Sequence, residues 1–402
     1  MKSPKILLIG IGGVYNYGCE AIVRGTAAII HQAYPDAEVI YASPRVIDDR
    51  RRLEGSKVIV VERKLPRRFS VKNIFRKLLS IVGIKWEPML DSLGILKGVD
   101  AVFSIGGDIY TLRPNGSYSM ALPKFCDAAK KRGVPCALWG ASVGPFTDNP
   151  KAEEFFAKHL AGLSLISARE SATVDYLRSL GICNKVVSCA DPAYVVAPEI
   201  KAGEIRQGSK FTIGINLSPL SVRHSGYAEN EIIQAQAKTI EGLIKAFDAR
   251  IVLIPHVFSD FNESDDDFRY LFKVKNAIAA ELKDSVDLVE VDLGFVGIKK
   301  VLINCNLVIA ARMHCAINAL ASHVPTILIS YSRKSIGMCE YVYGNVDWVL
   351  PLECFLKEGE VETKALSLKS QADKINKYLS RRIPEIQHEA YSPLKKIFKA
   401  VE

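Results

Sequence analysis

An arginine and a histidine stand directly after an apolar run in the C-terminal third of the chain, in the order Arg312-Met313-His314. A segment of small residues follows, and a second apolar run ends at a basic pair that includes Lys334. This pattern predicts two parallel strands of an open α/β sheet, and such sheets bind ligands at the carboxyl ends of their strands. The first acidic residue along the chain after Arg312 is Glu340. We therefore expect a cationic crevice for a substrate with several negative charges, such as a phosphate and a carboxylate.

The first apolar strand runs into a glycine-rich turn that spans Gly10 to Glu20 and opens a helix. Backbone amides at a helix start can bind an anion. The turn is not a dinucleotide-binding fingerprint, because Tyr15 stands where the third glycine would be needed. It also lacks the lysine of a Walker loop. We expect Asn16 and Tyr17 to line a cleft and contact an acceptor; the alternative is a tight turn in which Asn16 caps the helix.

Three further strand ends carry polar residues. Gly107 follows a buried strand, and a glycine lets the backbone approach a ligand closely. The adjacent Asp108 is a candidate general base for a sugar hydroxyl, with an ordinary turn or helix-cap aspartate as the alternative. Ser142 follows another strand and could contact a ligand. Arg169 ends a fourth strand, where it either points into the cleft or pairs with Glu170 on the surface.

The composition is that of an ordinary globular protein that favours acidic ligands. The chain has 402 residues, a formal net charge of +9, 49% hydrophobic residues and 24% charged residues. Its nine cysteines include no Cys-x-x-Cys pair, and no His-Glu zinc spacing occurs, so we expect buried free thiols, no metal and no cofactor. The N-terminus shows no signal peptide and no apolar run reaches the length of a membrane span, so we expect a cytoplasmic location.

Short apolar strands alternate with helical segments, which predicts parallel sheets. The expected strands are Lys5–Gly10, Glu38–Ser43, Lys57–Glu62, Ala101–Gly106, Cys136–Val143, Leu163–Arg169, Lys185–Asp191, Phe211–Asn216, Arg250–His256, Val286–Asp292, Leu307–Arg312 and Thr326–Tyr331. The pattern restarts after the polar stretch Ala197–Gly208, where we place a domain boundary. We expect an N-terminal domain over 1–200, a C-terminal domain over 209–365, and a helical tail over 366–402. The tail should be broken at Pro384 and Pro393 and pack back on the first domain.

In order along the chain, these motifs resemble the polysaccharide pyruvyl transferase family. The matching segments are Asn16-Tyr17-Gly18-Cys19-Glu20, Gly106-Gly107-Asp108, Trp139-Gly140-Ala141-Ser142-Val143-Gly144-Pro145, Ala168-Arg169-Glu170-Ser171, Asp191-Pro192, Arg312-Met313-His314 and Tyr331-Ser332-Arg333-Lys334. They cover about residues 5–340, which is most of the chain. No single segment is specific, whereas the ordered set is. The family often has a small residue where this chain has Asp108, so that position departs from its pattern.

The resemblance implies a GT-B-like fold of two Rossmann-like αβα domains that face each other across a cleft. It implies transfer of an enolpyruvyl unit from phosphoenolpyruvate onto two sugar hydroxyls, which forms a cyclic ketal and releases phosphate. Arg169, Arg312 and Lys334 would bind phosphoenolpyruvate, which is a co-substrate and no cofactor. His314 would protonate its methylene carbon, and Asp108 is the weaker candidate for the base.

Three other functions remain open from the sequence. A nucleotide-sugar glycosyltransferase can use the same fold, and Glu340 is then a candidate ribose-binding acid. A non-catalytic glycan- or anion-binding accessory protein of polymer export is a second alternative. A redox enzyme of the deazaflavin type is a third, although no cofactor motif supports it.

The segment Arg63–Trp86 contains no acidic residue, and its basic residues alternate with apolar ones. A helix with this pattern can lie in a bilayer interface, where it would help the enzyme meet a lipid-linked acceptor at the inner face of the membrane. The alternative is a helix whose apolar side packs on the protein. We expect no nucleic-acid binding, because no basic-aromatic surface recurs elsewhere in the chain.

Overall fold

The computed structural model describes residues 3–64, 73, 87–113, 115–197, 210–331, 333–394 and 396, with the backbone alone for Arg333. The chain divides into two compact units. Unit 1 comprises Met1–Val14, Ile22–Pro192 and Glu389–Glu402, and unit 2 comprises Tyr15–Ala21 and Ala193–His388. A short N-terminal segment is therefore part of unit 2, although the strand before it belongs to unit 1. The predicted boundary falls on residues that lie, apart from Ala197, outside the described part of the chain.

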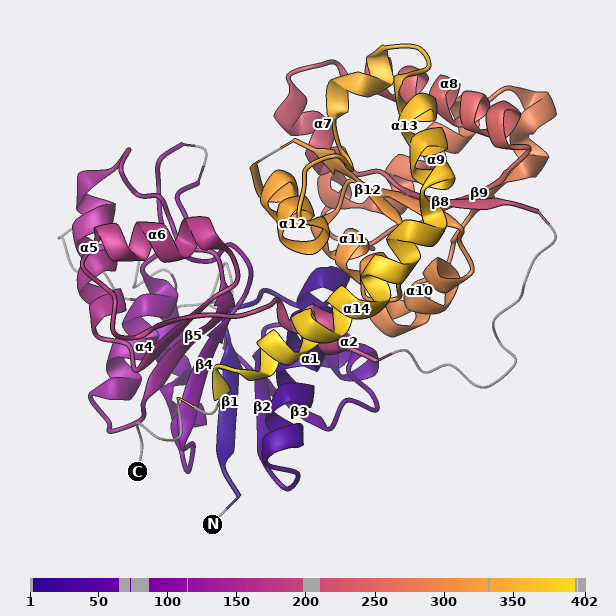
Figure 1. Cartoon of the computed structure of the whole chain (residues 1–402). Coiled ribbons are helices and arrows are strands. Elements are labelled where there is room, and N and C mark those ends of the chain that lie inside the picture. The colour runs from indigo at the N-terminus through magenta and orange to yellow at the C-terminus, as the bar shows by residue number, and fades with distance from the viewer. Residues whose placement is uncertain are drawn as a thin grey trace. The chain divides into compact units, whose positions relative to one another are not determined.

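Unit 1 is built on a seven-stranded parallel sheet with the order β3-β2-β1-β4-β5-β6-β7. Its strands are β1 (Lys5–Ile9), β2 (Glu38–Ser43), β3 (Val58–Glu62), β4 (Ala101–Ile105), β5 (Cys136–Ala141), β6 (Leu165–Ala168) and β7 (Val186–Ser188). The helices between them are α1 (Tyr17–Ala33), α2 (Val46–Arg52), η1 (Pro88–Leu96), α4 (Ala121–Lys130), α5 (Pro150–Ala161) and α6 (Ser171–Ser179), and η2 (Pro192–Val195) follows β7 (Figure 1). The strand order reverses between β1 and β4, which is where doubly wound sheets bind ligands.

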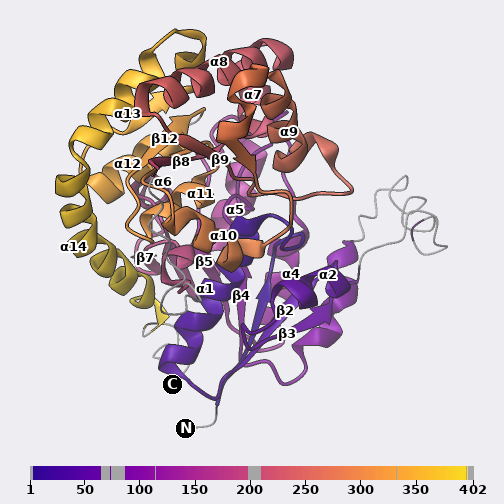
Figure 2. The same ribbon diagram turned by 90° about the vertical axis from the view of Figure 1, so that its right-hand side faces the viewer.

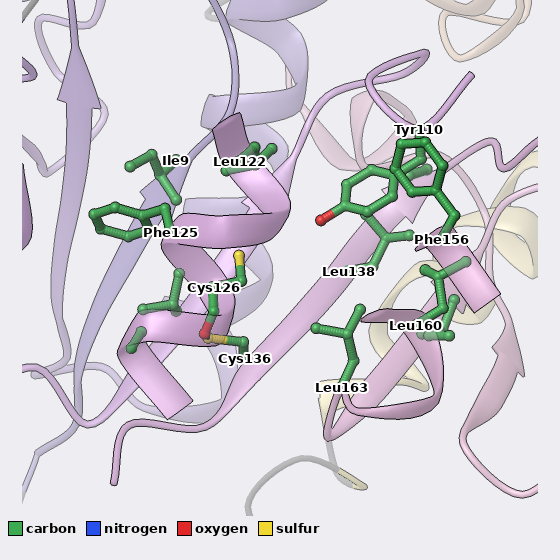
Figure 3. Packing of buried hydrophobic residues seen from close by; sticks show 14 of the residues in the cluster. Ile9, Tyr110, Leu122, Phe125, Cys126, Cys136, Leu138, Phe156, Leu160 and Leu163 are labelled. Atoms are coloured by element: carbon green, nitrogen blue, oxygen red, sulfur yellow. The ribbon is translucent and has the colours of Figure 1, made fainter. Parts of the chain in front are cut away.

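The core of unit 1 is formed where α4 and α5 pack on the sheet (Figure 3). Phe125 on α4 and Phe156 on α5 are fully buried, as is Leu138 on β5. Burying each such side chain stabilises the fold by roughly 1.5–3 kcal/mol. Tyr110 is buried in the same cluster, and its hydroxyl is hydrogen-bonded to Nε2 of His159 at 3.0 Å. This core fixes the segment directly after the Gly107-Asp108 turn.

Unit 2 repeats the architecture with a six-stranded parallel sheet in the order β10-β9-β8-β11-β12-β13. Its strands are β8 (Thr212–Asn216), β9 (Arg250–Leu253), β10 (Val286–Leu288), β11 (Leu307–Ala310), β12 (Thr326–Ser330) and β13 (Val349–Pro351). Figures 1 and 2 show α8 (Glu229–Phe247) and α13 (Glu360–Ser370) on one face, with α10 (Gly294–Ile303) and α11 (Met313–Leu320) on the other. The remaining elements are α7 (Pro219–Ser225), η3 (Glu263–Asp265), α9 (Asp267–Ala277), η4 (Ala280–Ser285), α12 (Arg333–Tyr343), η5 (Leu352–Leu356) and α14 (Ala372–Tyr391). Two Rossmann-like domains, as predicted, are confirmed.

The predicted break at Pro384 is wrong, because α14 continues through this residue. A proline inside a helix costs about 3 kcal/mol. The helix nevertheless buries Leu379, Ile383 and Ile386 completely, and each such burial is worth roughly 1.5–3 kcal/mol. The apolar stripe therefore outweighs the lost backbone hydrogen bond.

All nine cysteines are free, and seven of them are buried. Within the described ranges, no helix combines the length and the apolar character needed to cross a membrane. The basic segment Arg63–Trp86 lies outside the described residues except for Arg63, Lys64 and Asn73. Its predicted contact with a membrane stays a prediction.

Candidate functional site

In unit 1, the residues predicted at three strand ends meet around one guanidinium group, together with Asp191, which follows β7. Arg169 follows β6, and its Nε and Nη2 atoms donate to Oγ of Ser142 at 3.2 and 3.1 Å. Its Nη1 donates to a carboxylate oxygen of Asp191 at 2.7 Å. Nη2 also lies 3.6 Å from a carboxylate oxygen of Asp108. We call these residues, with Gly107, the Arg169 cluster.

Glycine at position 107 lets the guanidinium occupy the space that a side chain would otherwise fill. A Cβ atom on Gly107 would lie 2.8 Å from Nη2 of Arg169. The carbonyl of Gly107 also accepts a hydrogen bond from the Ser142 backbone amide at 2.9 Å. The twin-glycine turn after β4 and the turn after β5 are thereby tied together beneath Arg169.

The Arg169 side chain is 5% exposed, and that of Asp191 is 6% exposed. Burial lowers the pKa of Arg169, but the carboxylates of Asp191 and Asp108 outweigh it, so the net pKa lies above its ordinary value. Arg169 is therefore a fixed cation. It pairs with Asp191 and Asp108 rather than with Glu170 on the surface, and Asp108 remains half exposed, with 53% of its side chain accessible.

In unit 2, a fully buried carboxylate organises the carboxyl ends of three neighbouring strands. Asp267 accepts from Nε and Nη2 of Arg312 at 3.1 and 2.8 Å. It also accepts the backbone amide of His256 at 3.0 Å. Asn216, at the end of β8, receives the backbone amide of Arg312 on Oδ1 at 2.8 Å. The turn before α11 is therefore held in place through both its backbone and its side chain, at the point where the strand order reverses.

The expectation that Arg312 has no acidic neighbour is wrong. Besides Asp267, the carboxylate of Asp265 accepts from Nη2 of Arg312 at 2.9 Å. Burial lowers the pKa of Arg312, but Asp267 and Asp265 outweigh it and hold the net pKa above its ordinary value. Burial raises the pKa of Asp267, and the hydrogen bonds from Arg312 and His256 act against that rise. Within the described residues, Nη1 of Arg312 makes no hydrogen bond, which leaves it as the donor available to a ligand.

His314 lies in the first turn of α11, and its imidazole packs against the N-terminal motif. A Cβ atom on Gly18 would lie only 2.4 Å from Nδ1 of His314. Asn16 caps α1, because its side-chain oxygen accepts the Gly18 backbone amide at 2.9 Å. The segment that contains Asn16 therefore forms one wall around His314, and it belongs to the same unit as the histidine.

Tyr17 is fully buried, which leaves no surface of its side chain for an acceptor. Its hydroxyl donates to Asp292 at 2.7 Å, and its ring packs edge-on against His256 with the centroids 5.4 Å apart. Glu20 accepts a hydrogen bond from the Phe295 backbone amide at 2.9 Å and so caps α10.

Burial, together with the nearby His314 and Arg312, lowers the pKa of His256 to about 3, so this imidazole is neutral near pH 7.

Lys334 lies half-buried in the first turn of α12, directly after β12. Strand β12 pairs with β11, which leads to Arg312 and His314. The three predicted residues of unit 2 therefore follow adjacent strands. Within the described residues, no group of three His, Cys, Asp or Glu side chains is placed to hold a metal ion.

Sequence reasoning did not assign Asp191, Asp265, Asp267 or the packing role of Gly18. The available signals were the Asp191-Pro192 junction and the run of three aspartates from Asp265, which follows β9. In unit 2, the imidazole of His314 follows Arg312 by two residues. The guanidinium of Arg312 is held by the carboxylates of Asp265 and Asp267. Such a pair can bind an anion and transfer a proton to or from it.

Comparison with known proteins agrees with these motifs. The family model of polysaccharide pyruvyl transferases matches residues 16–333. The amylovoran biosynthesis protein AmsJ of Erwinia amylovora is 23% identical over 415 residues, covering 95% of this chain and 96% of that protein.

Solved structures share the fold at low sequence identity. A UDP-GlcNAc 2-epimerase from Neisseria meningitidis superposes with a TM-score of 0.59 at 11% identity, covering 98% of this chain and 100% of that one. A glycosyltransferase from Rickettsia africae gives 0.57 at 11% identity, covering 100% and 99%. HepE from Anabaena, solved with UDP and glucose, gives 0.56 at 13% identity, covering 98% and 99%. These neighbours place the fold in the GT-B class.

Proposed function

Because the chain belongs to the polysaccharide pyruvyl transferase family, we propose that it transfers an enolpyruvyl unit from phosphoenolpyruvate to a sugar. The observation that carries this proposal is the Arg312-x-His314 pair. The guanidinium is fixed by two carboxylates, and the imidazole is fixed against Gly18. A fixed cation next to a fixed proton donor suits a donor molecule that must be both bound as an anion and protonated on carbon.

We assign the anionic groups of phosphoenolpyruvate to Arg169, Arg312 and Lys334. Arg312 offers Nη1 first, since its other nitrogens donate to Asp265 and Asp267 in this structure. Arg169 keeps its planar guanidinium oriented by Ser142 and Asp191. Arginine suits this task because its planar group binds carboxylate and phosphate oxygens in pairs.

His314 then donates its proton to the methylene carbon of phosphoenolpyruvate, which leaves an oxocarbenium-like centre at C2. A sugar hydroxyl attacks C2 and loses its proton to a base, for which the half-exposed Asp108 is the weaker candidate. The bond between C2 and the phosphate oxygen breaks, and phosphate leaves. A second hydroxyl of the sugar attacks C2 and gives its proton to His314, which is neutral after the first step, and this closes the ketal. These reaction steps need no oxidant, reductant or metal.

The acceptor we propose is a sugar of a surface or exported polysaccharide, in line with the name of the related AmsJ. Unit 2, with Arg312 and His314, would serve the donor together with Arg169 of unit 1, and the rest of unit 1 would serve the acceptor. Gly107 in unit 1 and Asn16, which belongs to unit 2, remain candidates for acceptor contacts. A lipid-linked form of the acceptor would agree with the basic segment Arg63–Trp86.

The test compares ligands and one variant. Phosphoenolpyruvate should raise the thermal unfolding temperature of the protein, and UDP or UDP-sugars should not. His314→Ala should lower turnover by about 10²–10⁴-fold, the usual contribution of general acid catalysis, while phosphoenolpyruvate still binds. Stabilisation by UDP-sugars alone would instead favour a glycosyltransferase, and near-wild-type turnover of His314→Ala would remove the assigned acid.

A further inference from the structure

Two arginines of unit 2 meet at one carboxylate, although they are far apart in the sequence. Asp265, in η3, accepts a hydrogen bond from Nη2 of Arg312 at 2.9 Å. Its carboxylate also lies 3.8 Å from Nη2 of Arg223, at the end of α7. Arg223 is held there by a hydrogen bond from Nη1 to Oγ of Ser264 at 3.2 Å. The position between two guanidinium groups is typical of a phosphate or carboxylate site.

The two acidic partners of Arg312 differ in how firmly they are held. Asp267 is 0% exposed and accepts hydrogen bonds from three residues. Separating the two would leave the fully buried carboxylate of Asp267 without a cationic partner, which proteins strongly disfavour. Asp265 has 20% of its side chain exposed, and among the described residues its carboxylate forms ion pairs with the two arginines alone. Asp267 is therefore the permanent partner, and Asp265 can exchange with a ligand.

We propose that Arg223 and Arg312 form an anion subsite for which Asp265 is a built-in competitor. A phosphate or carboxylate that binds there takes the place of the Asp265 side chain. With Asp265 in place, the two arginines and the two aspartates are formally neutral together. When its carboxylate turns away, one positive charge is available to the incoming anion. The identification of that anion with phosphoenolpyruvate rests on the proposed function, whereas the competition itself does not.

The neighbourhood of Arg223 supports a ligand site rather than a purely structural ion pair. Its side chain is 49% exposed. The next residue, His224, stacks on Tyr331 with ring centroids 5.7 Å apart. This contact places the end of α7 beside the end of β12, which leads into Lys334. Three cationic residues therefore follow the carboxyl ends of β8, β11 and β12, which are adjacent strands.

If Asp265 competes with anions, removing its carboxylate should tighten anion binding, whereas removing another carboxylate nearby should not. Isothermal titration of inorganic phosphate into the full-length protein should give about fivefold tighter binding for Asp265→Asn, corresponding to the ~1 kcal/mol upper range of a partly exposed ion pair. The matched control is Glu263→Gln, which removes the same charge from the same loop. Glu263 pairs with Arg269 and not with Arg312, so its loss should leave phosphate affinity within twofold. Arg223→Gln should weaken binding relative to wild type.

Asp265→Ser, which also lacks the carboxylate, checks that the asparagine amide does not itself bind Arg312. Phosphate affinity that is unchanged or weaker in both Asp265 variants would overturn the inference, as would an equal gain in Glu263→Gln. Absence of phosphate binding in wild type and both variants would overturn it as well. Phosphoenolpyruvate turnover is measured separately. Tighter phosphate binding in the Asp265 variants without any turnover would contradict the proposed function but support the competition. Turnover without tighter phosphate binding in these variants would support the proposed function but contradict the competition.

Discussion

Substitution of Gly18 by alanine separates the effect of packing on His314 from the effect on folding. The added Cβ atom would lie 2.4 Å from Nδ1 and 2.7 Å from Cγ of the imidazole. Favourable contacts between such atoms lie near 3.5–4.0 Å, so the ring must move by about 1 Å. A displacement of that size at a reacting group can lower turnover by roughly 10²-fold. We therefore expect a large loss of activity.

The stability of the variant should change much less. Alanine in place of glycine inside a helix is worth up to about 1 kcal/mol, whereas crowding a packed site costs typically ~1–3 kcal/mol. The two effects partly cancel, so the net loss in the free energy of unfolding should stay below ~2 kcal/mol.

The assay measures initial rates of phosphate release from phosphoenolpyruvate together with thermal unfolding. The control is Gly337→Ala in α12, where a Cβ atom would meet nothing within 4 Å, so activity should be retained. Wild-type rates in Gly18→Ala would refute the claim that His314 must keep its place against this glycine.

Three further outcomes follow from the same contacts. The buried His256 has a pKa of about 3 in the folded protein, below the 6.5 of a free imidazole. As the pH drops below 6.5, the unfolded state therefore takes up a proton that the folded state does not, and the free energy of unfolding falls. Between pH 6.5 and 5 this group should remove about 2 kcal/mol from the free energy of unfolding, and urea titrations of His256→Gln should show a shallower pH dependence. Tyr110→Phe should lower the free energy of unfolding by about 1–3 kcal/mol, because Nε2 of buried His159 loses its partner; an unchanged urea midpoint would argue against that network. Asp267→Asn should lower turnover together with stability, whereas a loss of stability alone would limit Asp267 to a structural role.

The strands were predictable because buried parallel strands form continuous apolar runs. Their ends were less predictable. The run from Arg250 to His256 suggested one strand, yet β9 ends at Leu253, shortly before Pro255, which has no backbone amide to donate. The three-residue edge strand β13 (Val349–Pro351) was missed because so short a segment carries no periodic signal.

The basic residues of the site were also predictable, because they directly follow strands. Their acidic partners were not, since Arg312 and Asp267 are separated by 45 positions in the sequence. Proximity along the chain suggested Glu340 as the nearest acid, whereas the order β9-β8-β11 brings the segment after β9 close to Arg312. Only the strand order, which the sequence pattern does not specify, connects these residues. Gly18 and His314 follow strands of two different sheets, β1 and β11, so neither strand order predicts their contact.

The most direct test of the central claim follows the carbon that becomes the ketal centre. Phosphoenolpyruvate labelled with ¹³C at C2 is incubated with the protein and a panel of p-nitrophenyl galactoside, glucoside and mannoside, and ¹³C and ³¹P spectra are recorded together. We predict that a ketal carbon signal and inorganic phosphate appear at equal rates with at least one acceptor, and that both are lost in His314→Ala. Unconsumed phosphoenolpyruvate with every acceptor, together with binding of a nucleotide sugar by the same protein, would contradict pyruvyl transfer.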